Sequence, residues 1–536
     1  MLKRRVWMPI ALIFFTLALL TGVLFVYSLL KANILITEYL SLLIAVMVLL
    51  LYTAGVMLFY GLHRKRSVIR RVRRIIGIVL CVVIAAASIY GSTLLLRFNS
   101  AMRNVSAKPA SDTKAIVGVY VKNEDKAQSV SEMSGYRFGV LSDLGDETLH
   151  SNYAINYINE STGITVETVS YPNIAAAANA LRSDDVNALA VNIIYPGLLE
   201  NSESFQGFNS KVRLIEEIPV PSTATLENTP NVISADVTKA QTTPEPTPEP
   251  TPEPTPVPPV YGEDTTLIFY LSGVDKWEEG VSNTHSDVNL LMLVNTKTRQ
   301  VLLINTPRDY FITNPALNSG DKLTYCGLQG VENSMAALED YYEIDIDNYV
   351  KVNFSGFMIF VTDIGGITID NPVAFTGVLP SFSYYFPEGE IHLTGPEALA
   401  YVRERYAFGD GDLGRGRNQL RVITAIIDRL KTGGPSLMMK YPAIIEEMGD
   451  YFKTGLSSDQ ISDLIKVASR YLDEWDIKSY GVSGANGIRV PASSGMEEYI
   501  IWPKQTTVDF AIRLMKMIQN DEIITDEVLA EAPSVY

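Results

Sequence analysis

Charged and polar side chains stand in this sequence at places that solvation alone does not explain. Asp275 follows one short apolar run, Asp287 precedes another, and Arg308 comes just after a third. The other members of the set lie further along the chain: Arg403, Arg405, Asp412, Arg415 and Gln419. This combination suits phosphoryl transfer, because arginines can clamp phosphate oxygens bidentately and two aspartates can hold a hard divalent ion such as Mg²⁺ or Mn²⁺.

A glycine-rich segment separates Arg405 from Gln419. It reads Gly-Asp-Gly-Asp-Leu-Gly-Arg-Gly-Arg-Asn-Gln over residues 409–419, and we expect its part Asp-Gly-Asp-Leu-Gly, residues 410–414, to form a loop whose glycines let the backbone approach an anion closely. Arg415 and Gln419 are four residues apart at the start of a predicted helix and therefore share a face. Arginines gathered without a ligand are expected to repel one another. Each arginine taken singly also fits a surface ion pair, so the residues alone leave both interpretations open.

Three apolar runs are predicted to position the first members of the set. Residues 267–271, 288–294 and 301–305 have the character of buried strands. Residues 295–300, between the last two, are predicted to form a hairpin turn. Asp275, Asp287 and Arg308 would then lie at or near strand ends.

Helices are predicted to carry the later residues. Residues 396–402 and 418–430 read as helices, the second with leucine and isoleucine at helical spacing. Ser457 and Gln460 form a capping-box start to a further helix. Strands together with helices indicate an α/β domain over residues 262–520.

A second, smaller α/β unit is predicted over residues 112–222. No pair of nucleophile and base stands out in it, and His150 is expected to be a solvated surface residue, so we interpret the unit as a binding or scaffolding domain. Residues 223–261 are a proline-rich linker that repeats Thr-Pro-Glu-Pro and favours an extended polyproline spacer. Residues 521–536 are predicted as a carboxyl-terminal tail.

Residues 1–108 have the pattern of a membrane anchor. The runs 6–30, 33–62 and 75–96 are long and apolar enough for three transmembrane helices, and only the second contains a charged residue, Glu38. Basic clusters precede the first run and fill the loop between the second and third. The positive-inside rule therefore places the amino terminus in the cytoplasm and the later domains outside the cell.

The distribution of charge excludes some classes of function. The first 108 residues carry 14 basic side chains and one acidic side chain, a net charge of +13. The whole chain has a net charge of −16, so the residues after 108 carry a net charge of −29. So acidic an ectodomain is a poor nucleic-acid binder. The two cysteines, Cys81 and Cys326, are predicted to lie in different compartments, which excludes a disulfide between them. We expect Cys326 to be a buried, inert thiol.

The order of several motifs resembles the LytR-CpsA-Psr family. The similarity extends over residues 262–480, and the three spans with an extra exported domain are similar to the capsule-type members. The matching motifs are Ser286-Asp287 before residues 290–294, Thr306-Pro-Arg-Asp309, Val352-Asn-Phe-Ser-Gly-Phe357, Val361-Thr-Asp-Ile-Gly-Gly-Ile367, Leu393-Thr-Gly-Pro-Glu-Ala-Leu-Ala-Tyr-Val-Arg-Glu-Arg405, and Asp410-Gly-Asp-Leu-Gly-Arg415 with Gln419.

This resemblance implies a transferase of the Gram-positive envelope. Such a protein moves a glycopolymer, of the teichoic acid or capsular polysaccharide type, from an undecaprenyl-pyrophosphate carrier to a peptidoglycan acceptor and leaves a phosphodiester link. The family's pattern places Mg²⁺ (or Mn²⁺) on Asp275 and Asp287 and gives Asp412 the part of a base near the acceptor hydroxyl. It assigns the pyrophosphate to the arginines and glutamine: Arg308, Arg403, Arg405, Arg415 and Gln419.

The resemblance also implies a fold, an α/β/α domain with a central mixed sheet. An apolar slot for the polyprenyl chain would lie between sheet and helices, lined by residues such as Leu293, Phe354 and Phe357, although ordinary core packing is the alternative for all three. The sequence departs from the family's pattern where Thr306 replaces a serine. It departs again near Cys326, where the family usually has a histidine-containing segment.

Two other functions are compatible with the same residues. A lipid-pyrophosphate hydrolase would use the same clamp with water in place of a sugar hydroxyl. A membrane sensor, of the type labelled transcriptional attenuator, could use the smaller domain to bind a ligand. Direct reading of DNA is excluded, because the cytoplasmic parts are two short basic segments with no room for a folded reader.

Overall fold

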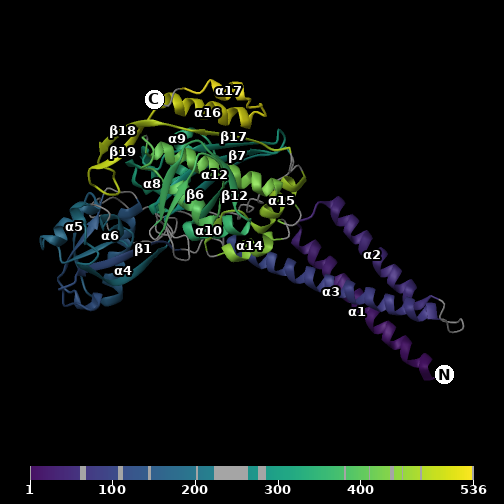
Figure 1. The fold of residues 1–536 in the computed structure, drawn as a ribbon. Coiled ribbons are helices and arrows are strands. Elements are labelled where there is room, and N and C mark those ends of the chain that lie inside the picture. Colours follow the sequence, from purple (N-terminus) through teal and green to yellow (C-terminus); the bar gives the residue numbers. More distant parts are fainter. Residues whose placement is uncertain are drawn as a thin grey trace, which may run out of the picture.

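The computed structural model describes most of the chain in three folded parts (Figure 1). The predicted linker at 223–261 lies outside the described residues. Described are residues 2–60, 68–106, 113–142, 146–200, 203–221, 264–275, 285–379, 382–409, 411–434, 437, 440–449, 451–470 and 474–533.

Three long helices form the first part. They are α1 (Leu2–Ala32), α2 (Thr37–Phe59) and α3 (Val68–Val105), and each is long and apolar enough to cross a membrane. Small side chains such as Ala18 and Ala54 are fully buried where the helices pack together. Most other apolar side chains of these helices are exposed, as expected of a surface that faces lipid. The sequence prediction of three apolar spans is confirmed.

A six-stranded mixed sheet forms the centre of the largest part. Its order is β16-β11-β6-β7-β8-β17, in which β11 with β6 and β8 with β17 are parallel and the other neighbours antiparallel. The predicted turn at 295–300 is confirmed, since Asn295 pairs with Gln300. The strands are β6 (Thr266–Val274), β7 (Ser286–Asn295), β8 (Gln300–Asn305), β11 (Asn348–Asn353), β16 (Phe452–Thr454) and β17 (Asp476–Gly481).

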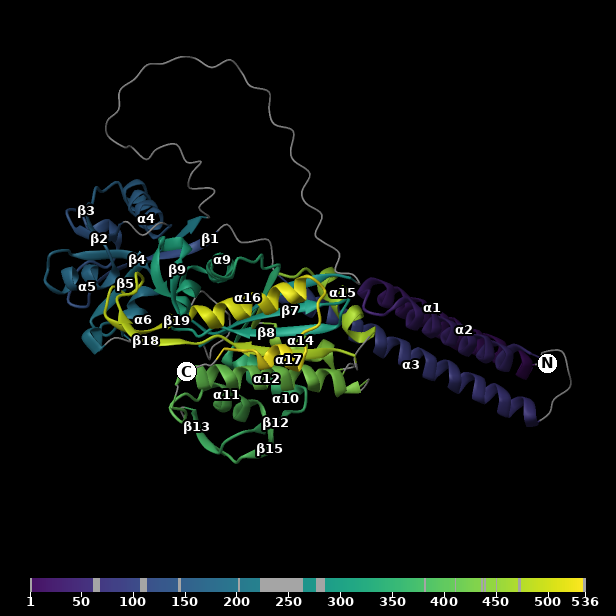
Figure 2. The same cartoon turned by 90° about the horizontal axis from the view of Figure 1, so that it is seen from above.

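Helices cover both faces of this sheet, so the predicted α/β/α arrangement is confirmed (Figure 2). One face packs against α9 (Val331–Tyr342) and α16 (Gln505–Gln519). The other packs against α12 (Asp412–Thr432) and α15 (Ser458–Arg470). The predicted capping box opens α15, since the Ser457 amide donates to Gln460 Oε1 at 2.9 Å and the Gln460 amide to Ser457 Oγ at 3.2 Å.

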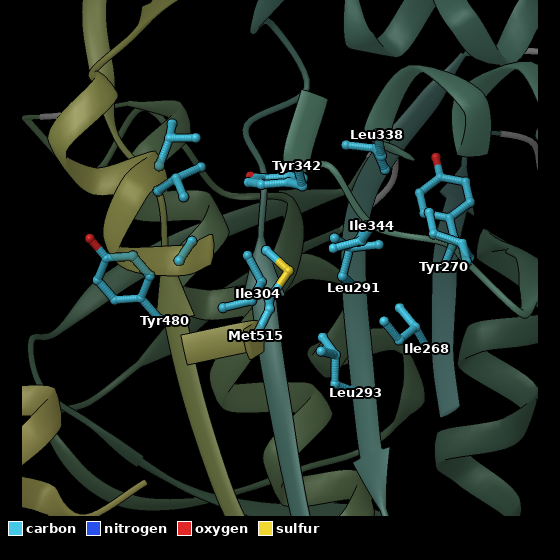
Figure 3. Close-up of a cluster of buried hydrophobic side chains, with 14 of the residues drawn as sticks. Ile268, Tyr270, Leu291, Leu293, Ile304, Leu338, Tyr342, Ile344, Tyr480 and Met515 are labelled. Carbon is cyan, nitrogen blue, oxygen red and sulfur yellow. The ribbon is translucent and has the colours of Figure 1, made fainter. Parts of the chain in front are cut away.

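Strand alternation separates residues that we expected to line one lipid slot. Leu293 is fully buried in the core under α9 and α16, beside Leu291 and Ile304 (Figure 3). Phe354 and Phe357 belong to a different core that includes α12 side chains. The expectation of a slot shared by all three is therefore wrong, because the Leu293 side chain points to the sheet face under α9 and α16, whereas α10 (Phe354–Asp363) carries both phenylalanines in a different core.

Smaller helices and strands complete the central domain, which is built around the six-stranded sheet. The helices are α8 (Leu323–Cys326), α10 (Phe354–Asp363), α11 (Gly395–Arg403), α14 (Tyr441–Met448) and α17 (Asp526–Ala530). The strands pair as hairpins or two-stranded ribbons: β9 (Phe311–Asn314) with β10 (Ser319–Lys322), β12 (Ile367–Asn371) with β15 (Gly389–Leu393), β13 (Phe375–Leu379) with β14 (Phe382–Phe386), and β18 (Gly484–Arg489) with β19 (Glu498–Pro503).

The segment predicted as a tail packs on this domain. The Ile524 amide donates to Gln300 Oε1 at 2.8 Å, and Asp521 accepts from Asn295 Nδ2 at 2.8 Å. Ile524 itself is fully buried in the core under α16. Residues 521–533 are therefore packed as part of the domain and do not form a separate tail.

The smaller α/β domain has its own five-stranded sheet of order β3-β2-β4-β1-β5. The expectation of a surface His150 is wrong: it is buried, 4.0 Å from Glu147, because both lie on the face of α4 that packs against β4. The elements are β1 (Thr113–Lys122), β2 (Arg137–Leu141), β3 (Glu167–Tyr171), β4 (Ala188–Asn192), β5 (Val212–Pro221), α4 (Asp146–Thr162), α5 (Ile174–Arg182) and α6 (Tyr195–Glu200).

The anchor and the smaller domain lie at opposite ends of the central domain in both views (Figures 1 and 2). At one end Phe98 and Met102 of α3 pack against Ile445, Ile461 and neighbouring apolar residues. At the other end the smaller domain shares an apolar cluster with side chains of the central domain: Leu317, Tyr325, Leu328, Ala492 and Met496. The central domain is thus held on both sides.

Candidate functional site

The site begins where β6 ends and β7 starts. These strands are antiparallel, and their pairing places Val274 opposite Ser286. Asp275 and Asp287, each the next residue, therefore come from neighbouring strands at the same edge of the sheet. Their carboxylates lie near enough for each charge to act on the other, although Asp275 is half-exposed and Asp287 largely buried.

Arg308 lies against Asp287. It follows β8 in the turn after Thr306, and its guanidinium forms an ion pair with Asp287 Oδ1. Its Nε is 3.6 Å from Asp309 Oδ1. The Thr306 hydroxyl, which stands in place of the family's serine, bonds the hydroxyl of Tyr342 at 2.8 Å in the core. This interaction supports the turn that holds Arg308.

Helix α11 places Arg403 beside Asp275. A capping box of Thr394 and Glu397 starts the helix, and Arg403 is its last residue. Its guanidinium stacks over the Phe354 ring at 4.5 Å and is 3.7 Å from Asp275 Oδ2. Arg403 therefore faces the carboxylate edge of the sheet.

Arg405 lies at the rim. Its guanidinium is 5.0 Å from the ring of Tyr406 and donates to the tyrosine hydroxyl at 2.8 Å. Both residues follow the end of α11, where Glu404 accepts from the amides of Tyr406 and Ala407. Arg405 is thus further from the sheet than Arg403.

Helix α12 starts earlier than the sequence suggested. The helix begins at Asp412, whereas we expected a loop at 410–414 and a helical run at 418–430, so residues 412–414 of the expected loop are helical. Gly416 lies inside it, and a Cβ there would come within 2.3 Å of Asn305 Oδ1. That glycine lets the helix pack directly on β8.

The first turns of α12 supply three of the predicted residues. Asp412 and Arg415 are both buried and form an ion pair with each other. Gln419 is buried, accepts from Asn305 Nδ2 at 3.0 Å and directs its own amide toward the backbone oxygen of Asp287 at 3.5 Å. The helix thus places Asp412, Arg415 and Gln419 beside the ends of β7 and β8.

Electrostatics distinguish the three aspartates. Burial and the charge of Asp287 raise the pKa of Asp275, while Arg403 opposes them. Burial also acts to raise the pKa of Asp287, but Arg308 and Arg415 outweigh it, so this pKa is lowered. For Asp412, burial raises the pKa above its ordinary value in spite of Arg415. The pKa of Asp287 thus lies below that of an ordinary aspartate, and the pKa of Asp412 lies above it.

The arginines are not gathered as one repulsive group. Arg308 pairs with Asp287, Arg415 with Asp412, and Arg403 approaches Asp275. The expectation of mutual repulsion is wrong, because each of these arginines has a carboxylate from another position beside it. The predicted residues form one cluster of alternating charge: Asp275, Asp287, Arg308, Arg403, Asp412, Arg415 and Gln419, with Arg405 at the rim.

A divalent cation fits one part of this cluster. Asp275 and Asp287 face each other closely enough that one anion raises the pKa of the other, and a cation would remove that repulsion. No group of three or more His, Cys, Asp or Glu side chains with metal-binding geometry occurs in the described part of the chain. Two carboxylates suffice for Mg²⁺, which usually keeps several waters and shares substrate phosphate oxygens.

Several residues near the site were not predicted. His285 is partly buried, with its ring 5.3 Å from the Tyr325 ring, and it lies two residues before Asp287 in the sequence. The Tyr325 hydroxyl donates to Glu498 Oε2 at 2.6 Å, and Lys322 Nζ is 2.6 Å from the same oxygen. Glu498 carried no motif in the sequence. His285 could have been found from its position two residues before Asp287. Cys326 is fully buried, and burial raises its pKa, as expected for an inert thiol.

Fold and site together define a class: an α/β/α domain on a three-helix anchor, with arginines and carboxylates gathered at one edge of its sheet. A sequence model of the LytR_cpsA_psr family matches residues 225–506, and the chain belongs to this family.

Named relatives cover part of the chain. A polyisoprenyl-teichoic acid–peptidoglycan teichoic acid transferase, TagU, of Bacillus cereus is 31% identical over 222 residues, which are 41% of this chain and 70% of that protein. TagU of Enterococcus faecalis is 32% identical over 203 residues, 38% of this chain and 64% of that protein. Both matches leave more than half of this chain uncovered.

Solved structures cover a similar share. Bacillus subtilis TagV is 23% identical over 49% of this chain and 100% of its own, with a TM-score of 0.41. A TagT structure with LIIa-WTA bound is 26% identical over 48% of this chain and 90% of its own, with a TM-score of 0.37.

Proposed function

We propose that this chain transfers a glycopolymer from a polyisoprenyl-pyrophosphate carrier to peptidoglycan. The observation that carries the proposal is the cluster of alternating charge, in which three arginines from separate elements surround one sheet edge. Membership of the family and the names of its relatives support the same reaction. The polymer class, teichoic acid or capsular polysaccharide, is part of the proposal.

The arginines would receive the donor. Guanidinium groups at Arg308, Arg403 and Arg415 match the oxygens of a pyrophosphate, each through charge-assisted bonds. Arg405 at the rim and Gln419 in the floor would add further donors. Since these groups stay fixed while negative charge develops on the leaving phosphate, they stabilise the transition state more than the ground state.

Asp412 is the candidate base. The acceptor hydroxyl would attack the phosphorus that carries the glycopolymer, and its proton would pass to the Asp412 carboxylate. A phosphodiester to the acceptor forms as the bond from that phosphorus to the bridging oxygen breaks, and the carrier leaves as its monophosphate. A raised pKa makes Asp412 a stronger base than an ordinary aspartate.

The metal part of the proposal concerns Asp275 and Asp287. These two carboxylates would hold Mg²⁺ (or Mn²⁺), which would supply positive charge to the pyrophosphate oxygens. The half-exposed Asp275 leaves room on the solvent side for the substrate oxygens and waters that such an ion needs.

The reaction assay separates transfer from hydrolysis. Full-length protein in detergent is given a radiolabelled lipid-pyrophosphate-linked glycopolymer with and without peptidoglycan. We expect label in peptidoglycan, joined through a phosphodiester, and little turnover without acceptor. Release of free polymer at the same rate in both samples would instead establish a hydrolase.

Location is proposed as a multi-pass protein of the cell membrane with the amino terminus in the cytoplasm and both folded domains outside. The basic clusters that flank the first run and fill the loop between the second and third runs support this orientation. A phosphatase that is active only outside the cytoplasm, fused after Tyr536, should be active. Activity only of a cytoplasmic reporter at that position would reverse the topology.

A further inference from the structure

The turn that holds Arg308 is supported by two segments that come later in the chain. On one side, the Thr324 amide of α8 donates to the Arg308 backbone oxygen at 2.9 Å. On the other side, the Ile501 amide of β19 donates to the backbone oxygen of the next residue, Asp309, at 2.8 Å. The backbone position of Arg308 therefore depends on how α8 and β19 are placed relative to each other.

Glu498 joins these two segments. It is the first residue of β19, and its Oε2 accepts from the Tyr325 hydroxyl of α8 at 2.6 Å. The same oxygen is 2.6 Å from Nζ of Lys322, the residue directly before α8. Lys322 Nζ is also 3.6 Å from Asp309 Oδ1, and Arg308 Nε is 3.6 Å from that aspartate oxygen. A continuous set of side-chain contacts thus runs from Glu498 to Arg308.

The charges in this set alternate in sign. Lys322 lies between the carboxylates of Glu498 and Asp309, and Asp309 in turn faces Arg308, which also pairs with Asp287. The side chains of Lys322, Asp309 and Glu498 are only 9%, 5% and 20% exposed. Because water is largely excluded, loss of one charge leaves its partner unbalanced. Without the Glu498 charge, Lys322 would move toward Asp309 and compete with Arg308 for it.

The smaller domain packs on both of the joined segments. Tyr325 of α8 and Met496, in the turn between β18 and β19, belong to one apolar cluster with side chains of α5 and α6. The hairpin lies next to these two helices in both views (Figures 1 and 2). The contact of Glu498 with Tyr325 therefore lies at the junction of the two folded domains, where packing from the smaller domain holds α8 and the hairpin together.

We infer that Glu498 is a positioning residue for Arg308. It ties β19 to α8 and holds Lys322 away from Asp309, so that the Arg308 guanidinium keeps the direction in which it meets the donor pyrophosphate. This role rests on the proposed function, in which Arg308 binds that pyrophosphate. Glu498 acts through contacts within the protein and touches no substrate.

A double-mutant cycle in full-length protein in detergent separates positioning from simple stabilisation. Transfer of glycopolymer to peptidoglycan is measured per folded molecule. Glu498→Gln, which removes the charge and keeps a hydrogen-bond acceptor, should lower the rate about tenfold to a hundredfold, as small displacements of a positioned group do. In an Arg308→Ala background it should lower the rate little further, because its effect passes through Arg308. Glu497→Gln, at the exposed neighbouring residue, is the matched control and should change nothing.

Binding of farnesyl pyrophosphate gives a second readout that does not require transfer. Isothermal titration calorimetry on the same four proteins of the cycle measures its dissociation constant. Glu498→Gln should weaken binding in the wild-type background and leave it unchanged in the Arg308→Ala background. A substitution that only lowers stability would not show this dependence on Arg308.

The transfer cycle decides first. An unchanged rate in Glu498→Gln overturns the positioning role, and so does an equal loss of rate in both backgrounds. If Glu498→Gln does not fold, Tyr325→Phe, which removes only the hydroxyl that bonds Glu498, decides by the same cycle. Wild-type protein that binds farnesyl pyrophosphate but transfers nothing refutes the proposed reaction, and the binding cycle then decides the role of Glu498. Wild-type protein that does neither overturns both proposals.

Discussion

Two groups of ionisable side chains in the central domain differ in a way that separates function from structure. In the site cluster, Asp275 and Arg403 are 42% and 31% exposed, and they approach no closer than 3.7 Å. Around Asp321, by contrast, everything is buried: Asn314 Nδ2 donates at 2.9 Å, Ser493 Oγ at 2.5 Å and the Lys322 amide at 3.0 Å.

The two groups differ in whether their charged atoms can still bind a ligand. Asp321 has its oxygens taken by protein donors, so it can only stabilise or destabilise the fold. Asp275 and Arg403 remain accessible, and their loose pairing leaves both able to bind something else. Substitutions in the first group should therefore alter stability, and substitutions in the second should alter chemistry.

The largest effect is expected from Asp275→Asn. Loss of one of two carboxylates should weaken Mg²⁺ or Mn²⁺ binding and reduce transfer on the order of 10³-fold, since a bound metal contributes several kcal/mol to charge stabilisation. Mn²⁺ binding, followed by its paramagnetic resonance signal, should fall in parallel. Full activity of wild-type protein in excess EDTA would remove the metal from the proposal.

Arg403→Ala should cost about 2–4 kcal/mol of transition-state stabilisation, a rate loss of tens to several hundredfold. Arg403→Lys should restore only part, because an ammonium cannot fork two oxygens. The melting temperature should hardly change, since Arg403 is partly exposed and loosely paired. Arg513→Ala, in which an exposed arginine loses its ion pair with Glu531 and its contact with the Phe510 ring, is the control. Unfolding of Arg403→Ala with normal activity per folded molecule would assign Arg403 to structure.

Asp321→Asn tests the buried side of the comparison. Burial raises the pKa of Asp321 from 3.8 to about 6. The folded state then binds this proton more tightly than the unfolded state. The free energy of unfolding therefore falls by about 3 kcal/mol as the pH rises from about 4 to above 6, and it stays lowered at higher pH.

The variant lacks this titration. The difference in unfolding free energy between Asp321→Asn and wild type, measured in urea, should therefore shift by about 3 kcal/mol in favour of the variant between pH 4 and pH 7. Asp345→Asn, at an exposed position, should show a constant difference. A constant difference for Asp321→Asn as well would mean that its hydrogen bonds fully offset the cost of burial.

The smallest effect is expected where the two folded domains meet. Met496 lies in the turn of the β18–β19 hairpin and packs against the apolar cluster of the smaller domain. Gly495 beside it has φ +67 and approaches Asn173 so closely that a Cβ would come within 2.2 Å. Met496→Glu should place a charge against this apolar contact and lower the free energy of unfolding, measured in urea, by about 1 kcal/mol. Val490→Glu, on the exposed side of the hairpin, should not. Equal effects of the two substitutions would mean that the apolar contact at Met496 does not contribute to stability.

Local pattern predicted those elements whose own residues decide their structure. The turn at Asn295–Gln300 and the capping box of Ser457 and Gln460 both formed as expected. The start of α12 did not follow local pattern, since glycines disfavour a helix. Packing of Gly416 on Asn305 outweighs that cost. Because Asn305 lies more than 100 residues before Gly416, the local sequence could not predict this contact.

What the sequence by itself determined is the inventory: three apolar spans, two α/β domains, and a set of arginines and aspartates whose order marks a family. Only the tertiary structure decided which aspartate lies beside which arginine. Asp287 meets Arg308, and Asp275 meets Arg403, because a strand edge and a helix end converge. The same folding brings Glu498 of the β18–β19 hairpin within 2.6 Å of Lys322 Nζ. Contacts between distant segments depend on register and packing of whole elements, which no local run of residues specifies.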